Sequence, residues 1–177
     1  MRMEKIYKGI SLIFSPYVIS LLSFAMLGDN IFIPFTFFFL FPIILSFPEL
    51  KNFNISMEHR IAILLKILVF YIIGTFLISG EQKVLGICYI INAIIAILIT
   101  RKYKISLHLF GITGPATALM MFSKLPAAAI LFILAPLVAF TRYKLRAHTI
   151  GQLLLGFIVG IASTALIIEV MMNLMKI

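Results

Sequence analysis

The sequence has no tryptophan, one cysteine and only six acidic residues among its 177 residues. The single cysteine, Cys88, lies inside an apolar run, which excludes a disulfide framework and a cysteine metal site. Without tryptophan, an aromatic belt at a membrane interface has to be built from tyrosines such as Tyr7, Tyr103 and Tyr143. Charged residues of both signs make up only 12% of the chain, which excludes an ordinary soluble domain.

Long hydrophobic runs fill the chain instead. Hydrophobic residues make up 63% of it, and the mean hydropathy is +1.17. A bilayer core about 30 Å thick needs roughly 20 apolar residues per helix. We therefore predict one integral membrane domain over residues 1–177, an all-α polytopic bundle of about six to seven spans. The predicted spans cover residues 9–27, 31–48, 61–79, 84–100, 105–121, 125–140 and 149–173.

Three of these spans have features that affect how they cross the bilayer. Pro34 and Pro42 interrupt the second span and remove backbone N–H donors that lipid cannot replace, so we expect it to be kinked or partly re-entrant. The fifth and sixth spans are short, with Gly111, Gly114 and Pro115 in the fifth and Pro126 and Pro136 in the sixth, and we expect both to pack deep in the bundle. The first run lacks a small-residue cleavage site, so we expect it to stay attached as the first helix.

The basic residues are distributed unequally between the two predicted faces. Seven spans place the N-terminus and the loops 49–60, 101–104 and 141–148 on one side, which carries eleven lysines and arginines against three on the other. The positive-inside rule then predicts a cytoplasmic N-terminus and a cytoplasmic basic face in the cell membrane. The net charge of +9 is assigned to topology and lipid headgroups rather than to nucleic acid. The eleven are Arg2, Lys5, Lys8, Lys51, Arg60, Arg101, Lys102, Lys104, Arg142, Lys144 and Arg146.

All three histidines also belong to the basic face. His108 opens the fifth span, and His148 opens the seventh, six residues after Arg142. Helix starts carry unpaired N–H groups and a positive dipole end, which suit an anion such as phosphate. Histidine and arginine together at such positions predict phosphoryl-transfer chemistry. Taken singly, each of these residues also fits a headgroup anchor or a snorkelling side chain.

Three neighbouring features also fit purely structural roles. Ser106 suits a serine bonded to the helix backbone, and Gln152 suits a polar contact between helices. Gly156 and Gly160 suit a closely packed helix face.

The spacing of these residues resembles the motifs of the membrane-bound type 2 phosphatidic acid phosphatase superfamily. Its third motif reads Ser-Arg, five residues, His, three residues, Asp, and here Thr141-Arg142 is followed at the same spacing by His148 and Gln152. Its second motif, Pro-Ser-Gly-His, is matched by the serine and histidine of residues 105–108. For the first motif, Lys, six residues, Arg-Pro, only the arginine is matched, by Arg60.

The resemblance implies a phosphatase-like core over residues 49–173 that hydrolyses a prenyl phosphate, a prenyl diphosphate or a phosphatidic acid-like lipid without metal or other cofactor. His148 would attack phosphorus and form a phosphohistidine, and His108 would protonate the leaving oxygen and then activate water. Gln152 would orient His148. The phosphate would be bound by Arg142, Ser106, Arg60 and Lys104.

Gln152 stands where the family has an aspartate, and this leaves two functions open. A glutamine oxygen accepts the imidazole N–H bond, but it supplies no negative charge to the imidazolium that forms. The chain is thus either a slow or specialised enzyme, or a non-catalytic protein that binds or transports a lipid phosphate. For transport, Lys66 and Glu169 are the candidate charges within the spans.

Overall fold

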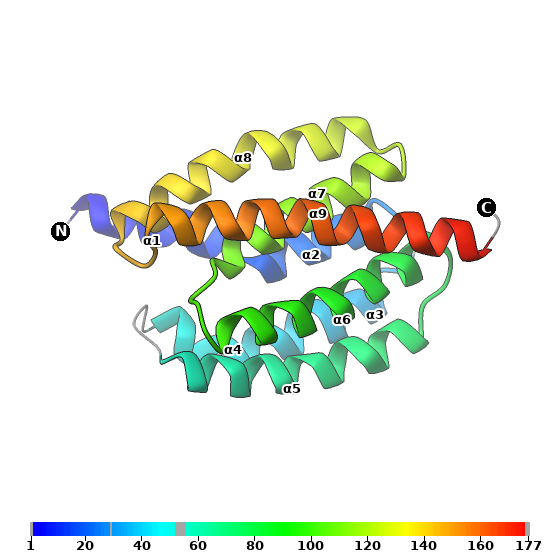
Figure 1. Ribbon diagram of the computed structural model, residues 1–177, viewed down its shortest axis with the longest axis horizontal. Helices are drawn as coiled ribbons and strands as arrows, with labels where there is room; N and C mark the ends of the chain where they lie inside the picture. Colours follow the sequence, from blue (N-terminus) through cyan, green and yellow to red (C-terminus); the bar gives the residue numbers. More distant parts are fainter. Residues whose placement is uncertain (1, 29, 52–55, 176–177) are drawn as a thin grey trace.

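Every secondary-structure element in the described part of the chain is a helix (Figure 1). The computed structural model describes residues 2–28, 30–51 and 56–175. The elements are α1 (Arg2–Ile13), α2 (Pro16–Ala25), α3 (Phe32–Pro34), the π-helix η1 (Phe35–Leu40), α4 (Phe41–Lys51), α5 (Met57–Phe76), α6 (Gly80–Thr100), α7 (Leu107–Met121), α8 (Leu125–Lys144) and α9 (Ile150–Met175).

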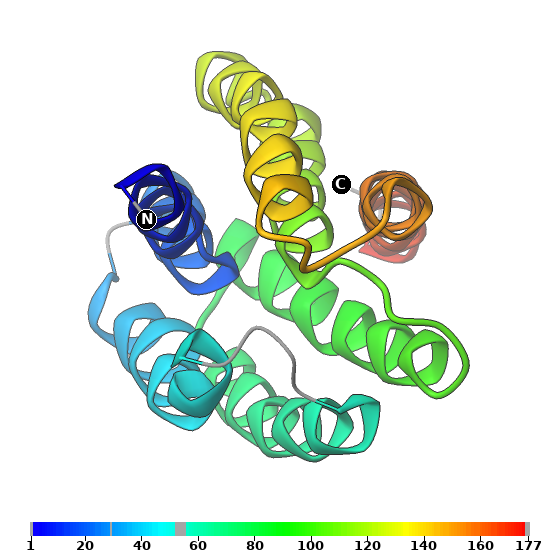
Figure 2. The ribbon, with the colours of Figure 1, turned by 90° about the vertical axis from the view of Figure 1, so that its left-hand side faces the viewer.

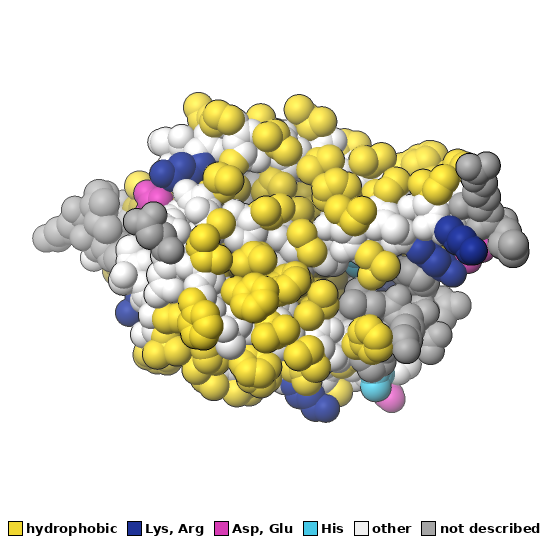
Figure 3. Space-filling model, turned by 180° about the vertical axis from the view of Figure 1, so that it is seen from behind, with side chains coloured by type: hydrophobic (Ala, Val, Ile, Leu, Met, Phe, Trp, Pro, Cys, Tyr) yellow, Lys and Arg dark blue, Asp and Glu magenta, His cyan; other side chains and the backbone are white. Residues whose placement is uncertain are grey.

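Five helical segments in the described residues are long and apolar enough to cross a bilayer: Met3–Ala25, which joins α1 and α2, and most or all of α5, α6, α8 and α9. Two shorter apolar segments, Phe32–Phe47 and Leu107–Met121, accompany them. On the face seen in Figure 3, hydrophobic side chains cover the middle of the molecule, and most lysines and arginines lie toward its two ends. The protein is therefore an integral membrane protein, as the composition predicted.

The first predicted span, 9–27, is wrong in its start and in its continuity. The helix begins at Arg2 and breaks between α1 and α2, because Pro16 has no backbone N–H and opens a new helix. The Ser15 hydroxyl caps that helix by accepting from Val18 N at 3.5 Å. Ser15 N donates to the Leu12 carbonyl at 3.1 Å, so it leaves the Ser11 carbonyl to another donor.

The second predicted span is irregular, as its prolines predicted, and it takes the form of a π-helix between two α-helical segments. Pro42 cannot donate to the carbonyl four residues before it, that of Phe38. The Ser20 hydroxyl of α2 shares its proton between that carbonyl, at 2.9 Å, and the Tyr17 carbonyl, at 2.7 Å. A neighbouring helix thus satisfies a backbone group that lipid would leave unpaired.

Helices α7 and α9 pack closely along their glycines. A Cβ on Gly156 would lie 2.5 Å from the Ser106 carbonyl oxygen, and one on Gly160 would overlap the Thr113 hydroxyl. Ser106 N also donates to the Gln152 carbonyl at 3.2 Å. The two glycines therefore form a closely packed helix face, which is one of the roles that the sequence predicted for them. This packing brings the starts of α7 and α9 side by side.

One end of the bundle collects the segments on which the sequence placed its site. The N-terminus, the turn between α8 and α9, and the segment before α7 all lie at that end, and the C-terminus lies at the other (Figure 1). Figure 2 looks directly onto this end. We call it the site end.

Candidate functional site

His148 lies in the turn at residues 145–149, and its ring is positioned by Gln152 in the first turn of α9, the helix that follows. Its Nδ1 lies 3.1 Å from Gln152 Oε1, and Thr149 N donates to the same oxygen at 3.2 Å. Because a backbone N–H only donates, the shared atom is an acceptor, and the imidazole Nδ1 therefore carries the proton. In the neutral ring this leaves the lone pair on Nε2.

The end of α8 explains the six-residue spacing between Arg142 and His148. Arg146 adopts a left-handed conformation with φ of 52°. Ala147 N donates to the Arg142 carbonyl at 3.1 Å and Arg146 N to the Tyr143 carbonyl at 2.9 Å, which is the Schellman pattern of a helix end. This turn reverses the chain and returns His148 to the neighbourhood of Arg142.

The surroundings of His148 keep its ring neutral. The side chain is buried, and burial lowers the pKa of the imidazole from its usual 6.5 to about 3, with the positive charges of Arg142 and Arg60 acting in the same direction. The hydrogen bond to Gln152 opposes that shift, and Lys104 adds to it. A neutral imidazole with a lone pair on Nε2, surrounded by cations, has the form required of a nucleophile toward an anion.

Arg142 and His108 meet at a residue of the first helix. Arg142 Nη1 donates to the Ser11 hydroxyl at 2.9 Å, and His108 Nε2 lies 3.2 Å from the same hydroxyl and 3.1 Å from the Ser11 carbonyl oxygen. Because a carbonyl only accepts, His108 Nε2 carries a proton. This is the carbonyl that the break at Pro16 left available.

Arg60 and Ser106 organise the entry to α7. Arg60 is buried near the start of α5 and donates from Nη1 to the Ile105 carbonyl at 3.1 Å. Ser106 is fully buried, and its hydroxyl caps α7 by accepting from Leu109 N at 3.5 Å. The geometry of Ser106 is thus that of a helix cap, and Arg60 fixes the segment that leads to it.

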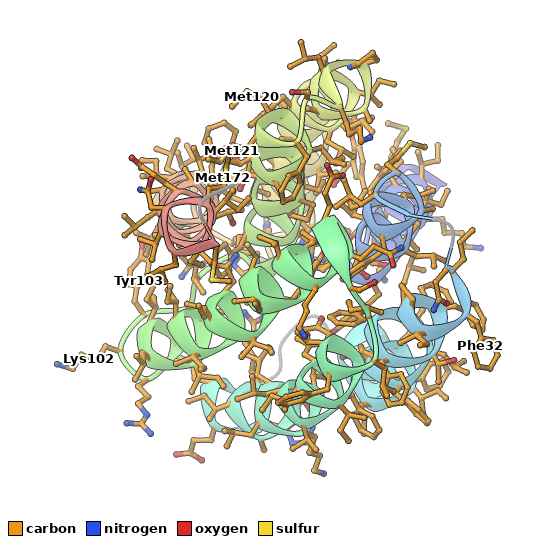
Figure 4. All side chains as sticks on the ribbon, turned by 90° about the vertical axis from the view of Figure 1, so that its right-hand side faces the viewer. Phe32, Lys102, Tyr103, Met120, Met121 and Met172 are labelled. Carbon is orange, nitrogen blue, oxygen red and sulfur yellow. The ribbon has the colours of Figure 1, made fainter. Side chains whose placement is uncertain are left out.

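A basic cleft opens beside His148 at the surface. It is lined by His148, Gln152 and the side chains of Lys104, Lys144 and Arg146, and none of the described residues along it is acidic. Behind it, Gly151 leaves room for Tyr103, whose hydroxyl would lie 3.0 Å from a Cβ at that position. Figure 4, seen from the opposite end, shows neighbouring Lys102 pointing away from the bundle.

The site residues predicted from the sequence therefore lie in one neighbourhood. His108, His148, Arg142 and Arg60 are close enough for their charges to interact, and Gln152 contacts His148. Lys104 lies at the cleft. His59 is exposed on the first turn of α5 and makes no side-chain contact with this group.

Some predicted positions fall outside the described residues. These are the side chains of Arg2 and Lys51, two of the basic residues counted above, and Phe53, which stands seven residues before Arg60, where the motif that the sequence resembles has lysine.

The residue that the sequence analysis missed is Ser11. It is buried in the site and contacts both Arg142 and His108, although it lies 131 residues before Arg142 and 97 before His108 in the chain. The pair Ser15-Pro16 was the available signal, since a proline inside an apolar run frees the carbonyls of the preceding turn. That signal locates a free carbonyl but not its partner.

No group of three or more histidine, cysteine, aspartate or glutamate side chains gathers to form a metal site in the described part of the chain. The groups that do gather are His148 with Lys104, Lys144 and Arg146 along the cleft, and His108, Arg142 and Arg60 within electrostatic range of His148. Such an arrangement binds an anion and places a neutral nitrogen lone pair beside it. No family model, no curated protein and no solved structure matches this chain.

Proposed function

We propose that this protein is a membrane lipid phosphatase that hydrolyses the phosphomonoester or diphosphate of a prenyl lipid or glycerolipid through a phosphohistidine. The observation that carries the proposal is the Nδ1–H bond from His148 to Gln152 Oε1, an oxygen identified by the Thr149 N–H. With the proton on Nδ1, the lone pair of the ring is on Nε2. The positive charges of Arg142 and Arg60 act on this ring. The motif spacing that resembles the type 2 phosphatidic acid phosphatases supports the same assignment.

The reaction has two steps. In the first, His148 Nε2 attacks phosphorus in line, the N–P bond forms, and the bond from phosphorus to the lipid oxygen breaks. His108, which becomes the imidazolium when the phosphate anion lies beside it, donates a proton to that oxygen and becomes neutral, and the lipid alcohol leaves. In the second, His108 takes a proton from water, the resulting hydroxide attacks phosphorus, and the N–P bond breaks to release phosphate and neutral His148. The cations Arg142, Arg60 and Lys104 stabilise the charge on the phosphoryl oxygens.

In this scheme Ser11 occupies the position that the substrate phosphate takes when it binds. Its hydroxyl accepts from Arg142 and its carbonyl accepts from His108, the two groups that serve the phosphate and the leaving oxygen. Substrate binding therefore requires both to exchange Ser11 for oxygens of the lipid phosphate. Rotation of the Ser11 side chain releases Arg142, but release of His108 from the backbone carbonyl requires α1 or the His108 ring to move when substrate enters.

A second candidate function is binding of a lipid phosphate without turnover. Two observations favour it: Gln152 supplies no negative charge to His148, and Ser11 occupies His108. The transport form of this alternative has less support, because Lys66 and Glu169 are both exposed rather than aimed into the bundle.

Phosphate release separates the two candidates. Purified protein is given prenyl phosphates, prenyl diphosphates and phosphatidic acid, and free phosphate is measured. We expect release from at least one substrate, a loss of at least about a thousandfold in His148→Ala, and unchanged release in His59→Ala, a control histidine on the same end. Equal inactivity of wild type and His148→Ala, with retained lipid-phosphate binding, would establish the non-catalytic function instead.

We further propose that the site end faces the cytoplasm of the cell, on the basis of the lysine and arginine distribution. The test labels single cysteines placed at Arg101 and at Lys83 in a Cys88→Ala background with an impermeant thiol reagent in intact cells. Labelling at position 83 alone fits this orientation, and labelling at position 101 from outside contradicts it.

A further inference from the structure

An apolar groove lies between α8 and α9, next to the basic cleft. Both helices pack against α7. They are joined by the turn at the site end and lie farther apart toward the other end of the bundle (Figures 1 and 4). The groove between them has a volume of about 370 Å³, whereas a cavity of roughly 150 Å³ accepts one benzene ring.

The floor of this groove is buried and its walls are exposed. Leu109 of α7, Ala135 of α8 and Leu153 of α9 form the floor and are each at most 7% exposed. Phe140 of α8 and Leu154 of α9 form the walls, and about half of each side chain is exposed. Because α8 and α9 cross the membrane, the groove opens sideways to the hydrocarbon of the bilayer.

Small side chains on α8 leave room for the groove. Ala135 and Ala139 lie four residues apart, on the same face of the helix, and both line the groove. Of the described residues along the groove, only Tyr143 carries a polar group on its side chain. The groove therefore suits an apolar ligand.

The groove and the basic cleft share part of their walls. Tyr143 and Ile150 line both of them. Lys144 lines the cleft, and its ammonium lies over the ring of Phe140 in the groove wall, 5.3 Å from the ring centroid. A ligand with an anionic end and an apolar chain can therefore occupy the cleft and the groove at the same time.

The depth of the groove matches one leaflet. From Tyr143 to Ala135 it follows eight residues of α8, or about 12 Å at 1.5 Å per residue. A bilayer core is about 30 Å thick. The groove thus extends from the site end to near the middle of the membrane.

The width of the groove fits one hydrocarbon chain. A volume of about 370 Å³ over a length of about 12 Å gives a cross-section of roughly 30 Å². A helix about 10 Å across needs roughly 80 Å², so a helix of a partner or of a second copy is too wide. A single chain whose carbons contact their neighbours at about 4 Å needs roughly 16 Å².

We propose that this groove receives one hydrocarbon chain of the lipid phosphate, and that the substrate enters the site sideways from the bilayer between α8 and α9. The inference rests on the proposed function for the position of the phosphate, which lies in the cleft among Lys104, Lys144 and Arg146. About 12 Å of groove takes roughly ten carbons of an extended chain.

The open side of the groove determines the substrate class. The rest of a long chain, and any second chain, stays in the surrounding lipid. The substrate is thus a lipid phosphate with one or two chains of at least about ten carbons, and it is selected by its phosphate rather than by its tail.

The first test maps where the chain lies. The probe is an alkyl phosphonate of about twelve carbons with a diazirine in its chain, because its C–P bond is not hydrolysed. It is photolysed with the protein in phosphatidylcholine nanodiscs, and its adducts are mapped. We expect adducts on Ala139, Leu154 and Phe157, and we expect an excess of unlabelled one-chain or two-chain phosphonate to remove them.

The control probe is the matching alcohol, which lacks the anionic group. We expect it to label the groove no more than it labels Ile133 and Ile158, which are exposed on α8 and α9 outside the groove. Equal labelling of the groove and of these two residues by the phosphonate would overturn the proposal. Groove adducts that persist in excess phosphonate would do the same, because they would come from surrounding lipid only.

Two substitutions block the groove from its opposite sides, Ala139→Leu on α8 and Leu154→Trp on α9. We expect each to weaken binding of the twelve-carbon phosphonate about tenfold and binding of methylphosphonate less than twofold. Ala129→Leu, at an exposed position of α8 outside the groove, is the matched control. If Ala139→Leu does not fold, Leu154→Trp decides, because unchanged binding of the long phosphonate in that variant contradicts the proposal.

A second copy of this chain is the other occupant to be tested. Leu154→Cys in a Cys88→Ala background is oxidised in membranes and examined by non-reducing electrophoresis. We expect a monomer. A disulfide-linked dimer that no longer forms phosphonate adducts in the groove would make this face an interface between copies and overturn the proposal.

The outcomes distinguish this proposal from the proposed function. Phosphonate adducts in the groove of a protein that releases no phosphate from any lipid support the groove and exclude the phosphatase. Phosphate release with adducts spread evenly over outward residues supports the phosphatase and excludes the groove.

Discussion

The two histidines of the site are held in different ways. His148 lies in the turn before α9 and is positioned by a glutamine four residues later, in the first turn of that helix. His108 is positioned by Ser11, 97 residues earlier in the chain and on a helix from the other end of the sequence. One half of the site is thus encoded locally, and the other half depends on the packing of α1.

This difference has a consequence for function. A locally held ring keeps its orientation whatever the rest of the bundle does, which suits a nucleophile that must stay aligned. A ring held by a distant helix changes partner when that helix shifts, which suits an acid that must transfer its proton to substrate. Under the proposed function, His148 would be the nucleophile, and the contact between His108 and α1 would control when His108 reaches the substrate.

The largest effect is expected from a negative charge at residue 11, where Arg142 and His108 meet. In Ser11→Asp the new carboxylate pairs with Arg142 and occupies the position of the phosphate. We expect phosphate release to fall about a hundredfold, with KM rising more than kcat falls. Steady-state kinetics on the best substrate measures this. Activity equal to wild type would show that Ser11 does not stand in the substrate's place.

The part of the site around His148 is tested by placing a negative charge at residue 152. Gln152→Glu keeps the reach of the side chain and both acceptor contacts, and it adds a carboxylate beside the imidazolium that forms. We expect kcat to rise about tenfold. Gln152→Leu, of similar size and without an acceptor, is the control and should lose activity. A rate that does not differ between Glu and Gln would contradict the orienting role of residue 152.

A smaller effect is expected from removing only the Ser11 hydroxyl. Ser11→Ala leaves the carbonyl that holds His108 but frees Arg142 Nη1 for the phosphate. We expect KM to fall about threefold with kcat within twofold of wild type. Ser20→Ala, a buried serine of α2 remote from the site, serves as the control in the same assay. An increase in KM would mean that the hydroxyl binds substrate rather than competing with it.

The smallest expected effect is on the protonation state of the His148 ring. Because the pKa of His148 is lowered to about 3, its ring stays neutral as pH falls from 7 to about 4, and its Nδ1 keeps the proton. Nitrogen NMR of protein with labelled histidine should show this ring as the Nδ1–H form throughout that range. In Gln152→Glu the carboxylate raises the pKa, so the same ring should titrate at higher pH. A wild-type ring titrating near 6.5 contradicts the burial and charge described above.

The sequence predicted the fold class and the local half of the site, for identifiable reasons. Apolar run length specifies membrane helices, and the spacing from Arg142 to Gln152 includes one helix end and one helical turn, both of fixed geometry. The glycines at 156 and 160 predicted close packing, which the contact with α7 confirms.

The remainder depended on contacts that no local pattern encodes. The first helix starts at Arg2 rather than at residue 9, because polar residues at its start continue a helix that hydropathy alone does not detect. Ser11 reaches His108 only through the packing of α1 against α8 and of α2 against α7. Gly111 of α7 packs against Pro16 of α2, and Gly114 packs against Thr164 of α9; the register between two helices is not readable from either one.

The most direct test of the account is to trap the phosphorylated enzyme. Protein is mixed with a lipid phosphate labelled on phosphorus, quenched in base within milliseconds to seconds, and digested for mass spectrometry. The account predicts an acid-labile phosphate on His148 Nε2 that is absent from His148→Ala. Phosphate release from wild type with no label on His148, or with label on another residue, would contradict it.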